Sequence, residues 1–258
     1  MHPARRAALA IVLASSLLAA GPAASASVPL VPKQHGDFDH YTLALTWQPG
    51  ICTVDGPPPT GGKRPERCSA DQPHTPLVGL HGLWASEPRA LQRKNVPVQT
   101  WWARGCDLYG GSGAVLFSGD VAAELDAVVP HYRESLILHE YGKHVLCFGF
   151  DPVQFFTTAL AMRRAVADAS FGRYLTSRAG RTAEHAAVVR AFERSFGTND
   201  AGAIQLECGR DSAGHEMLTQ LWINVKSDAL AAFPAAASLT HTAIDQDTCP
   251  AAFLLPSW

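Results

Sequence analysis

Three short segments of the chain carry the apolar pattern of β-strands. Residues 41–47 and 221–226 alternate apolar and polar side chains, which is typical of strands that bury one face. Residues 77–84 form an apolar run that carries His81. Pro49-Gly50 directly follows the first strand and is expected to end it.

Four other segments have helical spacing. Helices are predicted over 120–129 and 131–144. Asp151-Pro152 is a strong start for a third helix, with Asp as N-cap and Pro in the first turn. A fourth follows Thr182, has an apolar residue every four positions and is closed by Gly197. Because strands and helices are interspersed without a regular β-α-β rhythm, the sequence predicts an α+β fold with a central, mainly antiparallel sheet flanked by helices.

The N-terminus has the three parts of a secretory signal peptide. Arg5-Arg6 precedes an apolar run, residues 7–20, which is too short to span a bilayer comfortably, and Ala24-Ser25-Ala26 is a small-residue cleavage site. We expect cleavage after Ala26, which leaves a single domain over residues 27–258. The protein is then periplasmic or secreted, with no membrane attachment. An uncleaved anchor is the alternative.

Composition narrows the class of protein. With 47% hydrophobic and 17% charged residues, the chain is neither disordered nor a coiled coil. The formal net charge is -2, from 21 basic and 23 acidic residues. The expected cleavage removes two arginines and no acid, so the mature charge falls to -4. Such a chain should not hold nucleic acid tightly through many phosphate contacts.

All six cysteines follow the expected cleavage site, and none forms a C-x-x-C pair. An even number in an exported chain predicts three disulfides. Six cysteines allow 15 pairings, and the sequence alone does not choose among them. The simplest pairing is sequential: Cys52 with Cys68, Cys106 with Cys147, and Cys208 with Cys249.

The densest group of polar side chains is HEYGKH, residues 139–144. At about 100° per residue, a helix places His139, Glu140, Lys143 and His144 within one arc of about 140°. Apolar residues on both sides indicate a partly buried segment, where such groups must pair. The alternative is that these side chains pair with one another for structural reasons and have no catalytic role.

A zinc site is another interpretation of the same segment. Zinc-binding H-E-x-x-H motifs place their histidines four residues apart, whereas His139 and His144 are five apart. We therefore expect no metal and no other cofactor. The spacing instead places Glu140 one helical turn before His144, where a carboxylate can shift the proton affinity of the imidazole.

His81 lies in an apolar strand, where a histidine is more often a satisfied core residue than a catalyst. Gly82 beside it permits a close backbone approach. Two histidines from separate elements suit general acid–base catalysis, because one removes a proton while the other delivers one. A lysine can neutralise a developing anion. Without a Ser or Cys nucleophile motif, the set favours metal-free RNA cleavage, in which the 2′-hydroxyl attacks.

The two histidine segments resemble a known family. HGLW at 81–84 and HEYGKH at 139–144 are similar to H-G-L-W-P and H-E-W-x-K-H-G, the active-site patterns of the ribonuclease T2 family. FDHYTLALTWQPGIC at 38–52 and KHVLCFGFDP at 143–152 resemble its bacterial periplasmic branch, ribonuclease I. The resemblance spans about residues 38–249.

The resemblance implies an endoribonuclease that cleaves single-stranded RNA with low base specificity through a 2′,3′-cyclic phosphate. His144 would be the general base and His81 the general acid, with the roles reversed in the second step. Glu140 and Lys143 would stabilise the transition state, and His139 would help bind the phosphate. Trp84 would contribute to substrate binding by base stacking. The same resemblance supports Cys106–Cys147 and Cys208–Cys249, and Cys52–Cys68 fits the bacterial branch. We expect a monomer.

Four positions depart from the family patterns. Ala85 replaces a proline and should loosen a turn. Ser86 stands where some members of the family have an Asp that reads the base. Tyr141 replaces a tryptophan, which is a mild change. Val145 replaces a glycine, and would be strained if that position needs a positive φ. An RNA-binding protein with weakened turnover therefore stays open, as does a zinc hydrolase. An imidazole separation above about 12 Å would leave no shared phosphate within reach of His81 and His144.

Overall fold

A computed structural model describes most of the chain after the N-terminal segment. The expected signal peptide, the Pro/Gly-rich stretch at 56–65 and the first residues of the helix expected over 131–144 lie outside the described residues. Described are residues 30–55, 68–69, 71–111, 113, 115, 117, 119–129 and 136–258. No helix within these ranges is long and apolar enough to cross a membrane.

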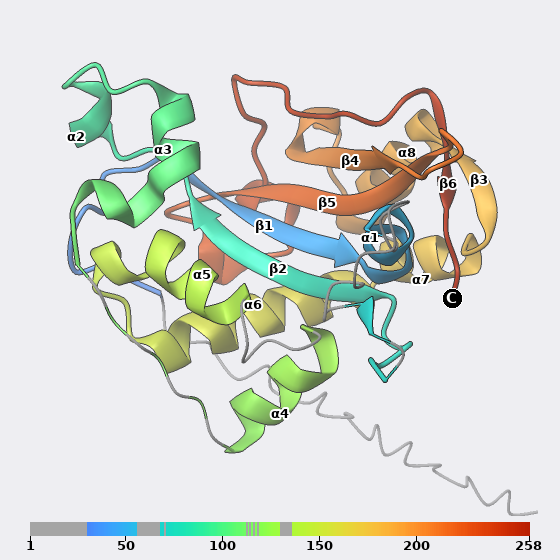
Figure 1. Ribbon diagram of the computed structural model, residues 1–258. Helices are drawn as coiled ribbons and strands as arrows, with labels where there is room; N and C mark the ends of the chain where they lie inside the picture. Colours follow the sequence, from blue (N-terminus) through green and yellow to red (C-terminus); the bar gives the residue numbers. More distant parts are fainter. Residues whose placement is uncertain are drawn as a thin grey trace, which may run out of the picture.

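A six-stranded sheet forms the centre of the molecule (Figure 1). The order is β2-β1-β5-β6-β3, and β4 pairs with β5. All pairings are antiparallel except that of β5 with β6. The predicted α+β fold with a mainly antiparallel sheet is confirmed. The strands are β1 His40–Trp47, β2 Val78–Ala85, β3 Arg181–Glu184, β4 Ile204–Arg210, β5 Glu216–Lys226 and β6 Ala252–Leu255.

Helices pack around this sheet, with α6 against β1 and β2, and α5 against β2 (Figure 1). The α-helices are α1 Gln48–Val54, α2 Arg89–Gln92, α3 Val98–Arg104, α4 Gly119–Val128, α5 Leu136–His144, α6 Pro152–Ala167, α7 Ser170–Ser177 and α8 His185–Phe196. Short 3₁₀ helices are η2 Gly105–Leu108, η3 Leu146–Phe148, η4 Ala201–Ala203, η5 Leu230–Ala232 and η6 Ala236–Ser238.

Local signals in the sequence placed several element ends correctly. Asp151 caps α6 by accepting a hydrogen bond from the backbone N–H of Gln154 at 2.8 Å. Gly197 ends α8 in the left-handed conformation. The pair Pro49-Gly50 does end β1, but it also begins α1, because Pro is well suited to a first helical turn.

Leu80 and Leu83 are both buried in the core, although an odd spacing along a regular strand would place them on opposite faces. The pairing explains this. Ala44 of β1 opposes Gly82 and Leu45 opposes Leu80, so His81 is the extra residue of a β-bulge. Bulges re-aim a side chain and are common beside functional sites. The bulge turns His81 away from the core, where its side chain is 25% exposed.

Three disulfides are present, as the cysteine count predicted, and their pairing is the simplest, sequential one. Cys106–Cys147 ties η2 to η3, directly after the C-terminal end of α5. Gly105 has φ +50°, and a Cβ there would lie 2.2 Å from the backbone oxygen of Lys143. The disulfide and this close approach together fix the end of α5 that carries the polar cluster.

Candidate active site

Glu140 is the centre of the site, and its side chain is 2% exposed. Trp84 Nε1 donates a hydrogen bond to Glu140 Oε2 at 2.6 Å, which links β2 to α5. His81 Nε2 lies 3.4 Å from Glu140 Oε1, within ion-pair range but too far for a good hydrogen bond. Glu140 Oε1 has no hydrogen-bond partner among the described residues. The residues that the sequence singled out on two separate elements therefore meet in one cluster.

Trp84 brings the two expected catalytic imidazoles close to one another. His144 stacks on its indole with ring centroids 5.3 Å apart, and His81 meets it edge-on at 5.0 Å. The centroids of the two imidazoles are therefore separated by no more than the sum of these two distances. This sum is below the separation of about 12 Å above which the two rings could not share one phosphate.

Gly82 allows this cluster to close. A Cβ at Gly82 would lie 2.2 Å from Glu140 Oε2 and 2.5 Å from Trp84 Nε1. Both atoms belong to the hydrogen bond that joins the strand to the helix. The expected close approach at Gly82 is therefore made by the side chains of Glu140 and Trp84, which lie against the backbone of β2. A larger residue at position 82 would break the hydrogen bond between them.

Burial controls the protonation of Glu140. Loss of hydration raises the pKa of this carboxyl from 4.5 to about 8, although the Trp84 hydrogen bond and Lys143 act in the opposite direction. Near neutral pH the carboxyl therefore keeps its proton unless a cation, such as protonated His81, lies against it. A buried carboxylic acid can donate a hydrogen bond to a ligand oxygen.

Burial has the converse effect on His144. Loss of hydration lowers the pKa of the imidazole well below 6.5, and the charges of Lys143, His139 and His81 lower it further. Its Nδ1 is buried and has no hydrogen-bond partner among the described residues. His144 is thus neutral near pH 7, the form in which an imidazole accepts a proton.

His139 lies at the exposed edge of the cluster, with its ring 6.3 Å from that of His144. Loss of hydration lowers its pKa, Lys143 lowers it further, and Asp107 raises it. The expectation from helical spacing that His139 and His144 lie too far around the helix to share a metal is wrong. One ligand atom from each of His139, Glu140 and His144 lies within 4.8 Å of the other two.

Sequence reasoning missed two residues of the site, Gln220 and Trp222 on β5. Gln220 Oε1 lies 2.6 Å from His81 Nδ1, and the Trp222 ring meets that of Trp84 edge-on at 5.4 Å. Trp222 carried a signal, because a tryptophan on the polar face of an alternating strand is unusual. Gln220 carried none, since a glutamine is ordinary on a half-exposed strand.

Three of the four departures from the family patterns are accommodated without strain. Val145 has φ −122° and is fully buried in the core, so the strain expected at a positive φ is absent. A turn was expected at Ala85, but Ala85 is the last residue of β2 and pairs with Tyr41. The Ser86 hydroxyl accepts hydrogen bonds from the backbone N–H groups of Asp39 and His40 at 3.1 and 3.2 Å.

The histidines outside the two motifs have structural partners where the structure describes them. Three pair with carboxylates: His185 with Asp247, His215 with Asp211, and His241 with Asp200. Two stack on aromatic rings, His35 on Tyr109 and His74 on Trp258. Burial lowers the pKa of His40, which is consistent with a structural position. His131 lies outside the described residues.

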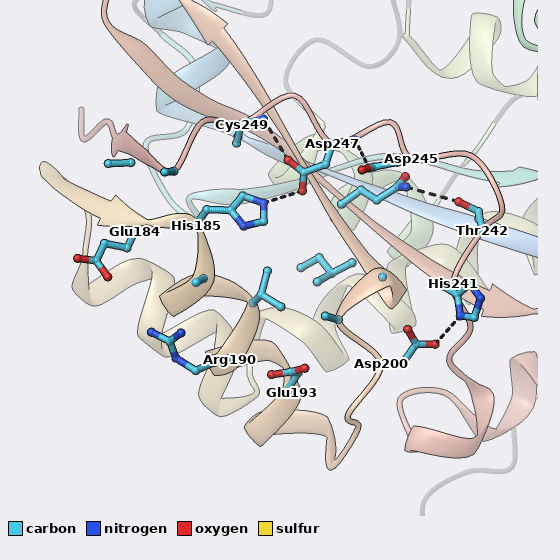
Figure 2. A pocket seen from close by; sticks show the side chains of 18 residues that line it. Glu184, His185, Arg190, Glu193, Asp200, His241, Thr242, Asp245, Asp247 and Cys249 are labelled. Atoms are coloured by element: carbon cyan, nitrogen blue, oxygen red, sulfur yellow. Dashed lines mark hydrogen bonds and ion pairs between the residues drawn. The ribbon is translucent and has the colours of Figure 1, made fainter.

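A separate hollow of about 1330 Å³ lies between α8, β6 and the segment at 241–249 (Figure 2). None of the candidate residues lines it. Its walls carry five carboxyl groups, one arginine and two histidines that pair with aspartates. This excess of negative charge disfavours a phosphate backbone, so the hollow is a poor site for nucleic acid. The carboxyl groups belong to Glu184, Glu193, Asp200, Asp245 and Asp247.

Solved structures of ribonucleases share this fold. SF11-RNase of Nicotiana alata superposes with a TM-score of 0.57 at 16% identity, covering 83% of this chain and 96% of that one. A variant of RNase MC1 in complex with 5′-UMP gives 0.54 at 18% identity, over 84% and 98%. At these identities the likeness shows the fold alone.

Sequence comparison goes further. Ribonuclease I of Escherichia coli (strain K12) is 31% identical over 238 residues, covering 86% of this chain and 87% of that protein. Residues 38–235 match the Ribonuclease T2 family, and this range includes His81, Trp84 and the whole 139–144 cluster. The chain therefore belongs to the ribonuclease T2 family and is a T2-type endoribonuclease.

Proposed function

We propose that this endoribonuclease cleaves single-stranded RNA through the imidazoles of His144 and His81, without a metal. His144 takes the proton of a 2′-hydroxyl, whose oxygen attacks the adjacent phosphorus. The bond from phosphorus to the 5′-oxygen breaks, and His81 protonates that oxygen as it leaves. The products are a 2′,3′-cyclic phosphate and a free 5′-hydroxyl. Water then opens the cyclic phosphate, with the two histidines in exchanged roles.

The observation that carries this proposal is the placement of both imidazoles against the one indole of Trp84. A single phosphate between them is within reach of both. Their environments also differ as the two roles require. Burial keeps His144 neutral and ready to accept a proton, whereas Glu140 Oε1 lies beside His81 Nε2 and favours a proton there.

The remaining groups stabilise the charge that develops on the phosphoryl oxygens. Lys143 supplies a positive charge next to the site. Glu140 Oε1 lies beside His81 Nε2, so the carboxylate holds the protonated imidazole and its positive charge near the developing anion. His139, exposed at the edge of the cluster, contacts the phosphate as the substrate enters.

Trp84 acts on Glu140 as well as on the substrate. Its N–H holds Glu140 Oε2 at 2.6 Å, so the indole orients the carboxyl group. Base stacking on Trp84 is the additional role that the family pattern implies. Low base specificity agrees with Ser86, whose hydroxyl is occupied by two backbone N–H groups. We further propose export to the periplasm or the medium after cleavage at Ala26, and a monomeric state.

The test is cleavage of homopolymer RNA in the presence of EDTA. The account predicts a 2′,3′-cyclic phosphate product from each of several homopolymers, at a rate unaffected by chelation. Each of His81→Ala and His144→Ala should lower kcat by about 10²–10⁴-fold. Loss of activity on chelation would instead support a zinc hydrolase, given the ligand atoms of His139, Glu140 and His144 within 4.8 Å. RNA binding without cleavage would support the weakened protein, which the unstrained Val145 disfavours.

A further inference from the structure

Gln220 is a half-buried contact of His81 that comes from a strand two positions away in the sheet. β1 lies between β2 and β5, so the two backbones are about 10 Å apart. Ala44 of β1 pairs with Gly82 on one side and with Trp222 on the other. Because directly paired residues share a face of the sheet, the small Ala44 leaves room above it for side chains from β2 and β5 to meet.

Two β-bulges aim the contact. His81 is the extra residue on β2, opposite β1. On β5, Glu207 of β4 opposes Gln220 and Cys208 opposes Leu218, so Thr219 is the extra residue directly before Gln220. The side chains of His81 and Gln220 meet at 2.6 Å between Nδ1 and Oε1. Bulges at both ends of one side-chain contact indicate that the sheet is shaped around it.

Trp222 determines which atom of the Gln220 amide faces this contact. The indole N–H of Trp222 lies 3.3 Å from Gln220 Oε1. An indole nitrogen can only donate, so the amide atom that faces it must be the oxygen, not the nitrogen. The same oxygen faces His81 Nδ1. Since that oxygen can only accept, Nδ1 of His81 must carry the proton.

We propose that Gln220, oriented by Trp222, is a positioning residue that fixes His81 in the tautomer with a proton on Nδ1. Nε2, the nitrogen beside Glu140 Oε1, is then the one that gains and loses the catalytic proton. The opposite tautomer would set the lone pair of Nδ1 against the amide oxygen. This proposal rests on the acid role of His81 proposed above, and it names the atom through which that role is performed.

The ring nitrogens of His81 report the tautomer directly. The protein is labelled with ¹⁵N-histidine and studied without substrate, with its disulfides intact. Two-dimensional NMR then distinguishes a protonated ring nitrogen from one without a proton. At a pH where His81 is neutral, the wild type should show Nδ1 protonated and Nε2 bare. Gln220→Leu should shift the ring to a mixture or to the opposite tautomer. A wild-type spectrum with the proton on Nε2 would overturn the proposal.

Activity supplies the second readout. Gln220→Leu should lower kcat for RNA about tenfold, the effect of one lost hydrogen bond, and leave KM within twofold. Gln220→Glu keeps an acceptor oxygen, so it should retain the wild-type tautomer and recover most of kcat. Because Gln220→Glu changes the same position and keeps the acceptor, recovery there shows that substitution at this position does not by itself remove activity. An unchanged tautomer and unchanged kcat in Gln220→Leu would contradict the proposal.

Matched variants isolate the part played by Trp222. Trp222→Phe keeps an aromatic ring but removes the N–H that orients the amide, so it should populate both His81 tautomers. Trp47→Phe removes a buried indole donor of the same kind, which bonds to the backbone oxygen of Pro256 at 2.9 Å, and should leave the tautomer unchanged. Equal spectra for the two variants would overturn the role of Trp222.

The two proposals fail in distinguishable ways. If His81→Ala cleaves RNA at the wild-type rate, the acid role of His81 is wrong, and a catalytic role for Gln220 falls with it. If His81→Ala is inactive but the wild-type ring carries its proton on Nε2, the acid role stands and the positioning role of Gln220 is wrong.

Discussion

At the scale of single residues, the site depends on a carboxyl group that is buried and only partly bonded. Glu140 donates or accepts according to its protonation, and burial raises its pKa from 4.5 to about 8. A buried group of this kind also affects stability, because the unfolded chain ionises it at a lower pH than the folded protein does.

Glu140 should therefore make the fold depend on pH. Its pKa is higher in the folded state, so its contribution to stability is complete below about pH 4.5 and is lost as the pH rises through about 8. In urea unfolding, the free energy of the wild type should fall relative to that of Glu140→Gln across this window. Glu184→Gln, at an exposed carboxyl on β3, is the control. A difference between wild type and Glu140→Gln that did not change with pH would contradict this assignment.

Gly82 gives a second residue-scale prediction. Gly82→Ala places a methyl group against Glu140 Oε2 and Trp84 Nε1, and should lower kcat/KM by more than about tenfold by breaking their bond. Gly142→Ala is the matched control, because a Cβ at Gly142 meets nothing within 4 Å. On α5 it should retain activity and add about 0.5–1 kcal/mol of stability. Steady-state kinetics and urea unfolding of both variants test the pair, and wild-type activity in Gly82→Ala would contradict the crowding argument.

The residues of the candidate site could be predicted from the sequence more completely than their arrangement. His81 stood out as an imidazole in an apolar strand, and Glu140, Lys143 and His144 as a dense group of polar side chains, whereas Trp84 was named only through the family resemblance. Gln220 did not stand out, and the unusual position of Trp222 did not show its role, since the importance of both comes from strands that pair across long separations in the sequence. The bulge at His81 was also invisible, because it depends on the register between β1 and β2.

At the scale of elements, two disulfides of equal span differ in what they hold. Cys106–Cys147 and Cys208–Cys249 both close 41 residues, so the chain-entropy argument gives each about 3–4 kcal/mol. Only Cys106–Cys147 lies beside α5, which carries the polar cluster.

Removing each disulfide should separate stability from catalysis. The double variant Cys106→Ala/Cys147→Ala should lose stability and also lose kcat, because the end of α5 is released. Cys208→Ala/Cys249→Ala should lose a similar amount of stability and keep kcat at a temperature where it is folded. Thermal unfolding and initial rates measure the two quantities. Equal effects on kcat would show that the position of α5 does not depend on its neighbouring disulfide.

Periodicity and capping predicted the longer elements well. The strands at β1, β2 and β5 and the helices α4, α6 and α8 follow from alternation, helical spacing and the Asp151 and Gly197 signals. The strands β3, β4 and β6 were missed. β3 and β6 have four residues each, too few for alternation to be visible, and they are defined by pairing with each other.

At the scale of the whole molecule, the charge limits how RNA is held. A chain with a formal net charge of -2 has no excess of positive charge to attract RNA, so binding must rely on the local charge of the site. The basic residues Lys63, Arg64 and Arg67 lie outside the described residues. The acidic hollow beside α8 adds negative charge away from the site (Figure 2).

Substrate binding should therefore be weak and strongly dependent on salt. KM for RNA should rise with ionic strength, with a log–log slope of about 0.7 for each phosphate contact. Lys143→Met should reduce that slope by about one contact, whereas Lys94→Met, at an exposed lysine after α2, should not. Steady-state kinetics over a salt series provides the slopes. Tight RNA binding that does not respond to salt would show that the net charge does not limit binding in this way.

The division of labour between the two imidazoles is the central claim, and a change of leaving group tests it most directly. A nucleoside 3′-(4-nitrophenyl phosphate) releases an anion that needs no proton, so it removes the need for a general acid. His81→Ala should lose about 10²–10⁴-fold in kcat/KM on RNA but only a few-fold on the nitrophenyl ester. His144→Ala should lose a similar large factor on both substrates. Equal losses of His81→Ala on the two substrates, or a retained rate on RNA, would contradict the assignment of His81 as the acid.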